Sequence, residues 1–239
     1  MPGFGRIYSI YHSPIPRSSP HLTTASYDLL IFRMTSLWYS TVLSLLPPST
    51  MLLDIGVGNA SSLLSPENVE VLKEKKLKVA GVDFTREYVE GAQGNIKRAG
   101  LEKEVKVVYG SVYDTKLLKS LVPSPRRKFD AAYFSGSISL LPDRVGALKS
   151  AASAVKKGGK IYVTQTYQKR TFPGLASLKR NLKYLTTIDF GELTMEAEIL
   201  DVFERAGEGA GCRLASHEKV PGSVDNAMQA AYLSVLVVD

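Results

Sequence analysis

The sequence predicts an α/β fold in which helices cover both faces of a doubly wound parallel sheet. Short apolar runs of strand length alternate along the 239 residues with segments of helical periodicity. Strands that alternate with helices form βαβ units, which place parallel strands side by side. The last two predicted strands, 212–218 and 230–238, are separated only by the loop 221–226. A connection without a helix indicates a hairpin, so we expect one antiparallel strand there.

The first predicted strand, 51–55, ends in a glycine turn. Residues 52–60 read LLDIGVGNA, so an apolar run leads directly into Gly56 and Gly58. Glycine lacks the Cβ that would keep a ligand away from the backbone, and it tolerates positive φ. The turn therefore predicts a site where a ligand approaches the main chain closely.

Two residues of this turn distinguish between possible ligands. Asp54 precedes the first glycine, where a carboxylate would oppose a pyrophosphate but would attract an ammonium or a sulfonium. Ser61 stands where the dinucleotide fingerprint requires its third glycine. The turn thus favours a cationic ligand over a nicotinamide dinucleotide.

The other elements follow in a regular order. Further strands are expected at 78–83, 105–109, 129–134 and 161–165, and helices at 66–76, 86–99, 115–121, 143–157 and 195–206. Thr85 is suited to cap the helix that Gly100 ends. Lys156 and Lys157 are expected in the last turn of the helix that Asp143 begins, since basic residues favour that end of the helix dipole.

In such sheets ligands bind beyond the carboxyl ends of the strands. Asp83 ends the second strand, where a carboxylate can accept hydrogen bonds from both hydroxyls of a ribose. Phe84 beside it is suited to pack on an adenine face, and Ser111 to bond an adenine edge. Together with Asp54, these residues indicate a nucleoside with a cationic tail.

Five motifs in order resemble those of class I S-adenosylmethionine-dependent methyltransferases, over about residues 50–166. They are LLDIGVGNA, GVDFT, VVYGSVYD, FDAAYFSGSISLLPD and VKKGGKIYVTQ. The resemblance implies a Rossmann-like, seven-stranded sheet in the order 3-2-1-4-5-7-6, with strand 7 antiparallel. It implies S-adenosyl-L-methionine as cofactor. The cofactor-binding residues implied are Tyr27, Asp54, Ile55, Gly56, Gly58, Asp83, Phe84, Gly110, Ser111, Val112 and Ser135.

The segment before the core resembles that of small-molecule methyltransferases, including the quinone-biosynthesis type. There a tyrosine such as Tyr27, some 25 residues before the first strand, often lies near the cofactor. The alternative is that Tyr27 is a core residue on the apolar face of an amphipathic helix. Ser111 stands where many relatives carry an aspartate, and its hydroxyl can still donate or accept a hydrogen bond. We expect a single domain over 1–239, with a helical cap over 1–45.

No acid–histidine constellation identifies a catalytic base. Tyr27, Tyr167 and His217 are the candidates, and a packing or hydrogen-bonding role is the favoured alternative for each. The chain has one cysteine and three widely separated histidines, so we expect no metal site. No apolar run approaches membrane-spanning length. These features favour a cytoplasmic protein, and residues 1–27 leave organellar import open.

The charge distribution gives the only clue to the acceptor. The net charge is +7, and residues 156–188 contain eight basic residues and no acid. Part of this run falls in an insertion expected over 167–193 to cover the substrate. Lys179, Arg180 and Lys183 fall largely off a leucine stripe, as in a basic amphipathic helix. It is either a lid with solvated lysines or a contact for an anionic acceptor, an anionic membrane surface or, least favoured, nucleic acid.

Three function hypotheses follow. The first is methyl transfer to a small or amphiphilic, lipid-like acceptor that can carry negative charge. The second is a methyltransferase of the same fold that acts on protein or RNA. The third is a nicotinamide-dependent oxidoreductase or a cofactor-binding protein without activity, which Asp54 and the missing third glycine oppose. The sequence leaves the oligomeric state open.

Overall fold

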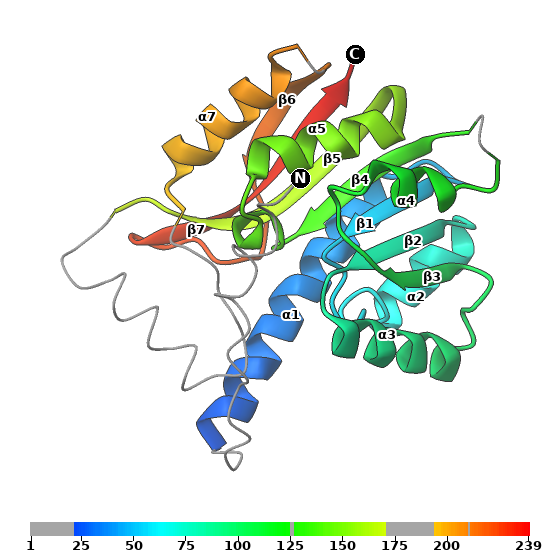
Figure 1. Ribbon diagram of the computed structural model, residues 1–239. Coiled ribbons are helices and arrows are strands. Elements are labelled where there is room, and N and C mark those ends of the chain that lie inside the picture. The colour runs from blue at the N-terminus through cyan, green and yellow to red at the C-terminus, as the bar shows by residue number, and fades with distance from the viewer. Residues whose placement is uncertain (1–21, 125–126, 171–193, 210) are drawn as a thin grey trace, which may run out of the picture.

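The computed structural model describes residues 22–124, 127–170, 194–209 and 211–239, and of residues 22–30 the backbone alone (Figure 1). Its strands are β1 (Met51–Ile55), β2 (Lys78–Asp83), β3 (Val105–Tyr109), β4 (Phe129–Ser135), β5 (Val155–Gln168), β6 (Cys212–Lys219) and β7 (Gln229–Val238). Its helices are α1 (Leu22–Leu45), α2 (Pro66–Glu74), α3 (Arg86–Ala99), α4 (Thr115–Ser120), α5 (Arg144–Ala154), α7 (Glu196–Gly207) and the short 3₁₀ helix η2 (Ile138–Leu140).

The sheet has the predicted order, β3-β2-β1-β4-β5-β7-β6, so β3 and β6 form its two edges (Figure 1). The strands β1 to β5 pair in parallel, and β7 runs antiparallel to both β5 and β6. The predicted topology and the closing hairpin are therefore confirmed. The carboxyl ends of β1 to β5 lie along the same end of the sheet, and the predicted ligand residues follow these strand ends.

One helix end was predicted wrongly. We expected the helix after Asp143 to continue to Lys157, but α5 ends at Ala154 and Val155 already pairs with Phe129 of β4. The ladder then shifts register and resumes at Lys160, with Gly158 at a φ of +72° between. Burial of Val155 in the core and an ion pair from Lys156 to Asp130, at 2.6 Å, favour this strand path over another helical turn.

Side chains alternate between the two faces of the sheet and form two separate cores. One core lies beneath α4, α5 and α7 and includes Leu53, Phe134 and Val163. The other lies beneath α1, α2 and α3 and includes Leu52 and Tyr133. The second core is unusual because Asp54 of β1 shares its face with these apolar side chains. A carboxylate is thus buried under α1.

The predictions for the N-terminal cap over 1–45 and for the insertion over 167–193 fall partly outside the described residues. Residues 171–193, which contain Lys179, Arg180 and Lys183, lie outside them, and so do residues 1–21. Strand β5 continues to Gln168, so Tyr167 lies within the strand and not after it. That the whole chain forms one domain stays a prediction. Among the described helices, none combines the length and the hydropathy needed to cross a bilayer.

Candidate functional site

The glycine turn after β1 contains two glycines that have different physical roles. Gly56 has a φ of +73°, and a Cβ there would lie 2.5 Å from the Cβ of Ser137, so packing excludes any larger residue. Gly58 has a φ of +59°, and a Cβ there would meet nothing within 4 Å. Gly56 therefore allows the turn to pack closely against Ser137, whereas Gly58 leaves the outside of the turn open to a ligand.

Asp83 holds this turn against the end of β2. One carboxylate oxygen accepts a hydrogen bond from the backbone N–H of Gly58, and the other from that of Thr85, both at 2.8 Å. The side chain is 9% exposed. Each carboxylate oxygen can accept a further bond, so Asp83 is both fixed in orientation and able to receive hydroxyl donors.

Asp54 is completely buried and receives one side-chain hydrogen bond. The hydroxyl of Tyr39, from α1, donates to Oδ2 of Asp54 at 2.8 Å. Oδ1 has no hydrogen-bond partner among the described residues. Burial raises the pKa of Asp54 to about 7; the Tyr39 hydrogen bond lowers it and the charge of Asp83 raises it. A carboxylate in this state is strongly biased toward a cationic partner.

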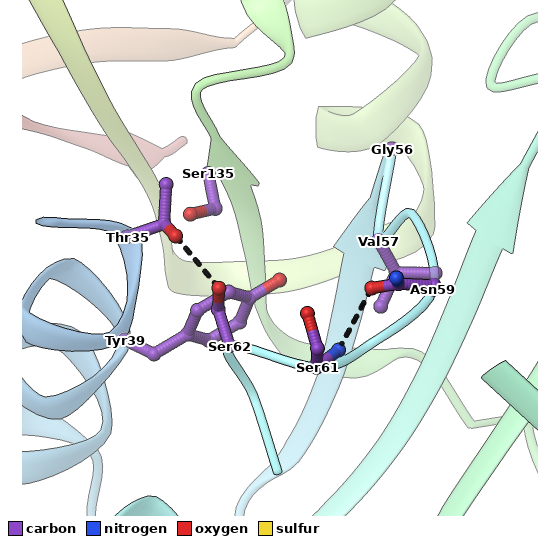
Figure 2. A pocket seen from close by; sticks show the side chains of 8 residues that line it. All are labelled: Thr35, Tyr39, Gly56, Val57, Asn59, Ser61, Ser62 and Ser135. Carbon is purple, nitrogen blue, oxygen red and sulfur yellow. Dashed lines mark hydrogen bonds between the residues drawn. The ribbon is translucent and has the colours of Figure 1, made fainter. Parts of the chain in front are cut away.

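A small open cleft lies between α1, the glycine turn and the end of β4. Its volume is about 120 Å³. It is lined by Thr35, Tyr39, Gly56, Val57, Asn59, Ser61, Ser62 and Ser135. Figure 2 shows Thr35 and Tyr39 reaching it from α1 and Ser135 reaching it from β4. Thr35 and Ser62 share a hydrogen bond of 2.6 Å across the opening, so α1 forms one wall of the site.

Aromatic rings lie beyond the ends of β2 and β3. Phe84 stacks on Tyr109 with ring centroids 5.8 Å apart, and the guanidinium of Arg86 lies 4.7 Å from the Tyr109 ring centre. Phe84 remains 41% exposed. The predicted adenine-packing ring is therefore supported on one side by another ring, with part of its surface accessible.

The loop after β3 is built around its own hydrogen bonds. The N–H of Gly110 donates to the carbonyl of Asp83 at 2.9 Å, which ties this loop to the end of β2. The hydroxyl of Ser111 accepts from the N–H of Tyr113 at 3.2 Å, and Val112 is buried. Ser111 is only partly buried, so its side chain serves the turn and part of it remains accessible.

Two of the candidate catalytic residues lie on the far side of the sheet. Tyr167 is fully buried among core residues under α7, with its ring 5.9 Å from that of His217. His217 stacks on Tyr232, and its Nδ1 lies 2.8 Å from the hydroxyl of Ser234. His217 and Asp54 are four strands apart, or about 19 Å at ordinary strand spacing. The packing interpretation of both residues is thus the stronger one.

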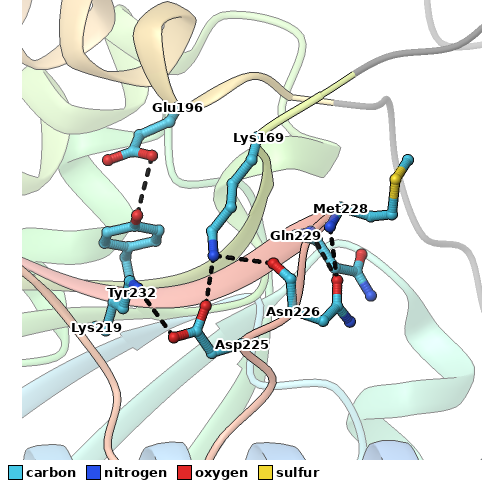
Figure 3. A network of polar contacts seen from close by, with 8 residues as sticks. All are labelled: Lys169, Glu196, Lys219, Asp225, Asn226, Met228, Gln229 and Tyr232. Carbon is cyan, nitrogen blue, oxygen red and sulfur yellow. Dashed lines mark hydrogen bonds and ion pairs between the residues drawn. The ribbon is translucent and has the colours of Figure 1, made fainter.

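A polar network lies next to these residues, around the described positions that flank residues 171–193. Lys169 and Lys219 both pair with Asp225, the latter at 2.9 Å, and the hydroxyl of Tyr232 donates to Glu196 at 3.0 Å (Figure 3). The N–H of Gln168 donates to the carbonyl of Thr194 at 3.0 Å. The two chain ends that border residues 171–193 therefore lie side by side.

Sequence reasoning did not find Tyr39 or Thr35. Tyr27 was the tyrosine expected near the cofactor, and its side chain lies outside what the structure describes. The missed signal is the spacing in α1, where Thr35 and Tyr39 are four residues apart and so share a helix face. Nothing in the sequence shows that this face covers Asp54, because that depends on how α1 crosses the sheet.

Comparison with known proteins agrees with this geometry. A family model described as a methyltransferase domain matches residues 47–207. A search of curated proteins by sequence found no match.

Among solved structures, a SAM-dependent methyltransferase from Aquifex aeolicus has a TM-score of 0.62 at 18% identity, with 87% of this chain and 93% of that one covered. A geranyl diphosphate methyltransferase in complex with SAM also has a TM-score of 0.62, at 13% identity and 94% coverage of each chain. The [4+2]-cyclase SpnF has a TM-score of 0.63 at 14% identity, with 87% of this chain and 81% of that one covered.

These likenesses show the fold, and the family model covers about two thirds of the sequence, from before β1 to the end of α7. The resemblance noted from the five sequence motifs is confirmed at the level of the family. The chain belongs to the class I methyltransferase family.

Proposed function

We propose that this protein transfers the methyl group of S-adenosylmethionine to a small or amphiphilic acceptor that can carry negative charge. The observation that carries the proposal is the buried Asp54 beside the glycine turn, with one oxygen unpartnered among the described residues. An ammonium and a sulfonium are the cationic groups of this cofactor, and a buried carboxylate is suited to them.

The residues present fit the cofactor. Gly58 leaves open space where a ligand would meet the turn, and Asp83 presents two oriented oxygens for ribose hydroxyls. Phe84 offers an exposed ring for adenine, and Asp54 offers a negative charge for the amino-acid end. We assign cofactor binding to these four residues, with Ser111 at the adenine edge.

When bound, S-adenosylmethionine supplies a methyl group already activated by a sulfonium, which an acceptor attacks in line. The chain contributes position and exclusion of water. Helix α1 covers the turn through Thr35 and Tyr39, and Ser135 closes the cleft from β4. Tyr27 remains a candidate for contact with the cofactor and for catalysis. Tyr167 is buried in the core under α7, on the opposite face of the sheet from Asp54, and His217 lies four strands away from it.

The proposal of an anionic acceptor is supported by the basic run of the sequence, because residues 156–188 contain eight basic residues and no acid. In the polar network at the start of this insertion, Lys169 and Lys219 are balanced by Asp225 and Glu196. A phosphate or carboxylate on the acceptor, or the anionic surface of a bilayer, would be attracted by the remaining basic residues.

The test has two stages. Calorimetry with S-adenosylmethionine, S-adenosylhomocysteine and NAD should show binding of the first two alone; binding of NAD alone would refute the proposal. Transfer of a labelled methyl group should then be followed in cell extract separated into small-molecule, lipid, protein and RNA fractions. We expect label in the first two fractions.

An alternative is methyl transfer to protein or RNA, which label in those fractions would favour, with salt-sensitive binding in the case of RNA. The fold alone does not decide the reaction, because the similar structure SpnF is a [4+2]-cyclase. Tight cofactor binding without transfer to any fraction would point to such a different use of the same fold.

A further inference from the structure

The contact between Tyr39 and Asp54 joins a helix outside the sheet to the centre of the proposed cofactor site. Both side chains are buried, and the hydrogen bond between them, 2.8 Å long, lies in the interior. Tyr39 is also edge-on to Tyr133 of β4, with ring centroids 5.1 Å apart. Packing therefore fixes the Tyr39 ring, and the ring places its hydroxyl on Oδ2 of Asp54.

No cation compensates this buried carboxylate among the described residues, since none of their ion pairs involves Asp54. The titratable groups that face it are Tyr39 from α1, Tyr133 from β4 and Asp83 from β2. The hydroxyl of Tyr39 is thus the one group among them that favours the ionised form, and Asp83 opposes it.

We propose that Tyr39 is a positioning residue for the cofactor, whose hydroxyl keeps Asp54 oriented and ionised so that it can attract the cofactor's ammonium. This inference rests on the proposed function and assigns a specific part of it to α1. Tyr39 acts through Asp54 and not on the reacting atoms.

The proposal predicts a dependence on pH. Burial raises the pKa of Asp54 to about 7, and the Tyr39 hydrogen bond lowers it from a higher value. Removal of the hydroxyl raises the pKa further, by about one pH unit for a hydrogen bond to a charged group. Fewer molecules then have Asp54 ionised at neutral pH, so the cationic ligand binds more weakly there and recovers at higher pH.

The test compares Tyr39→Phe with the wild type by calorimetry with S-adenosylmethionine between pH 6 and pH 9. The variant should bind about tenfold more weakly at pH 6 and nearly equally at pH 9. The amino group of the ligand titrates in the same way in both measurements, so the ratio of the variant's affinity to that of the wild type reports only on the protein. Tyr133→Phe is the matched control, because that hydroxyl is buried on the same face but bonds Thr164 at 2.7 Å. Its ratio should not vary with pH.

A second ligand separates the charge effect from a general loss of fit. 5′-Methylthioadenosine has the nucleoside but neither the ammonium nor the positive charge, so Tyr39→Phe should not change its affinity. An equal loss for both ligands, or a ratio independent of pH, would mean that Tyr39 only packs, and would overturn the inference while leaving the proposed function intact. A folded wild type that binds no S-adenosylmethionine at any pH would overturn both.

The wild type alone provides a further measurement if the variant does not fold. Binding at pH 7 should release a fraction of a proton from Asp54, detected in buffers of different ionisation enthalpy. The proton release on binding S-adenosylmethionine should exceed the proton release on binding 5′-methylthioadenosine. Equal release with the two ligands would refute the role of Asp54 and with it that of Tyr39. Folding itself can be followed through Trp38, the single tryptophan, which is 2% exposed and bonds Ser223 at 3.0 Å.

Discussion

Two acid–tyrosine pairs lie on opposite faces of the sheet, one fully buried and one partly exposed. Under α1, Tyr39 donates to Asp54 at 2.8 Å, and under α7, Tyr232 donates to Glu196 at 3.0 Å (Figure 3). The chemical groups are alike, but their surroundings differ. Glu196 begins α7, where the helix dipole favours negative charge, and its other oxygen lies 3.4 Å from His217. Its side chain is 34% exposed.

Asp54 has none of these compensations. It lies in the middle of the sheet with no exposure, and Asp83 adds a like charge nearby. A satisfied acid stabilises the fold, whereas an unsatisfied acid beside an open glycine turn indicates a ligand. Substitution at each pair should therefore have opposite consequences for stability and for binding.

The largest effect is expected for Asp54→Asn. Loss of the charge should lower the affinity for S-adenosylmethionine by about 100-fold, as measured by calorimetry. The same change should remove a penalty on folding. An acid whose pKa is raised in the folded state holds its proton more tightly there, so wild-type stability falls as pH rises from about 4 to about 7.

For Asp54 that loss amounts to something on the order of 4 kcal/mol. Denaturant unfolding at pH 5 and pH 8 should therefore show Asp54→Asn gaining on the wild type as pH rises. A constant difference between the two proteins would contradict this account.

The next effect separates the two glycines. Gly56→Ala should cost about 3 kcal/mol of stability, because a left-handed residue acquires a Cβ that overlaps Ser137. Gly58→Ala should cost only about 1 kcal/mol of stability, since its Cβ meets open space. It should nevertheless lower the affinity for the cofactor by at least about tenfold if the cofactor occupies that space. Thermal unfolding and calorimetry on both variants test the contrast, and similar results at both positions would refute it.

A smaller effect is expected for Glu196→Ala. The Tyr232 hydroxyl loses its acceptor and α7 loses an N-terminal charge, which together should cost about 1–2 kcal/mol. The affinity for S-adenosylmethionine should not change. Glu198→Ala is a matched control, because it removes the cap on the N–H of Met195 in the same helical turn but leaves Tyr232 paired. A loss of cofactor affinity in Glu196→Ala alone would show that the second pair is functional too.

The smallest effect is the contribution of His217 to acid sensitivity. Burial lowers the pKa of His217, and it outweighs the opposite influence of Glu196. The unfolded chain then binds the proton more readily, so the stability that the neutral ring contributes is lost as pH falls below about 6.5. His217→Gln should therefore lose less stability than the wild type between pH 6.5 and pH 5 in denaturant unfolding. Asp54 acts in the opposite direction over the same range.

Much of the fold could be read from local patterns. The seven strands, the order of the sheet and the closing hairpin follow from apolar runs, turn residues and the family motifs, and the structure confirms them. The end of α5 could not be read in this way. Lys156 has a position that suits a helix C-terminus, but its pairing with Asp130 depends on where β4 lies.

The site divides in the same manner. Asp54, Gly58 and Asp83 could be predicted because each lies at or just beyond the carboxyl end of a strand, a position that the sequence marks. Tyr39 was missed because nothing local distinguishes it from other aromatic residues on the buried face of a helix. His217 and Tyr167 looked like candidate bases by residue type, and only the strand order separates them from the glycine turn.

Local patterns in the chain were enough to predict the elements, apart from the end of α5, as well as the family and the residues of the glycine turn, since these depend on backbone preferences and short-range order. Which of two similar acids lacks a partner, and which tyrosine lies above it, became visible only in the folded molecule. Those facts depend on how α1 and α7 pack against the sheet, and packing brings together residues whose separation along the chain carries no signal.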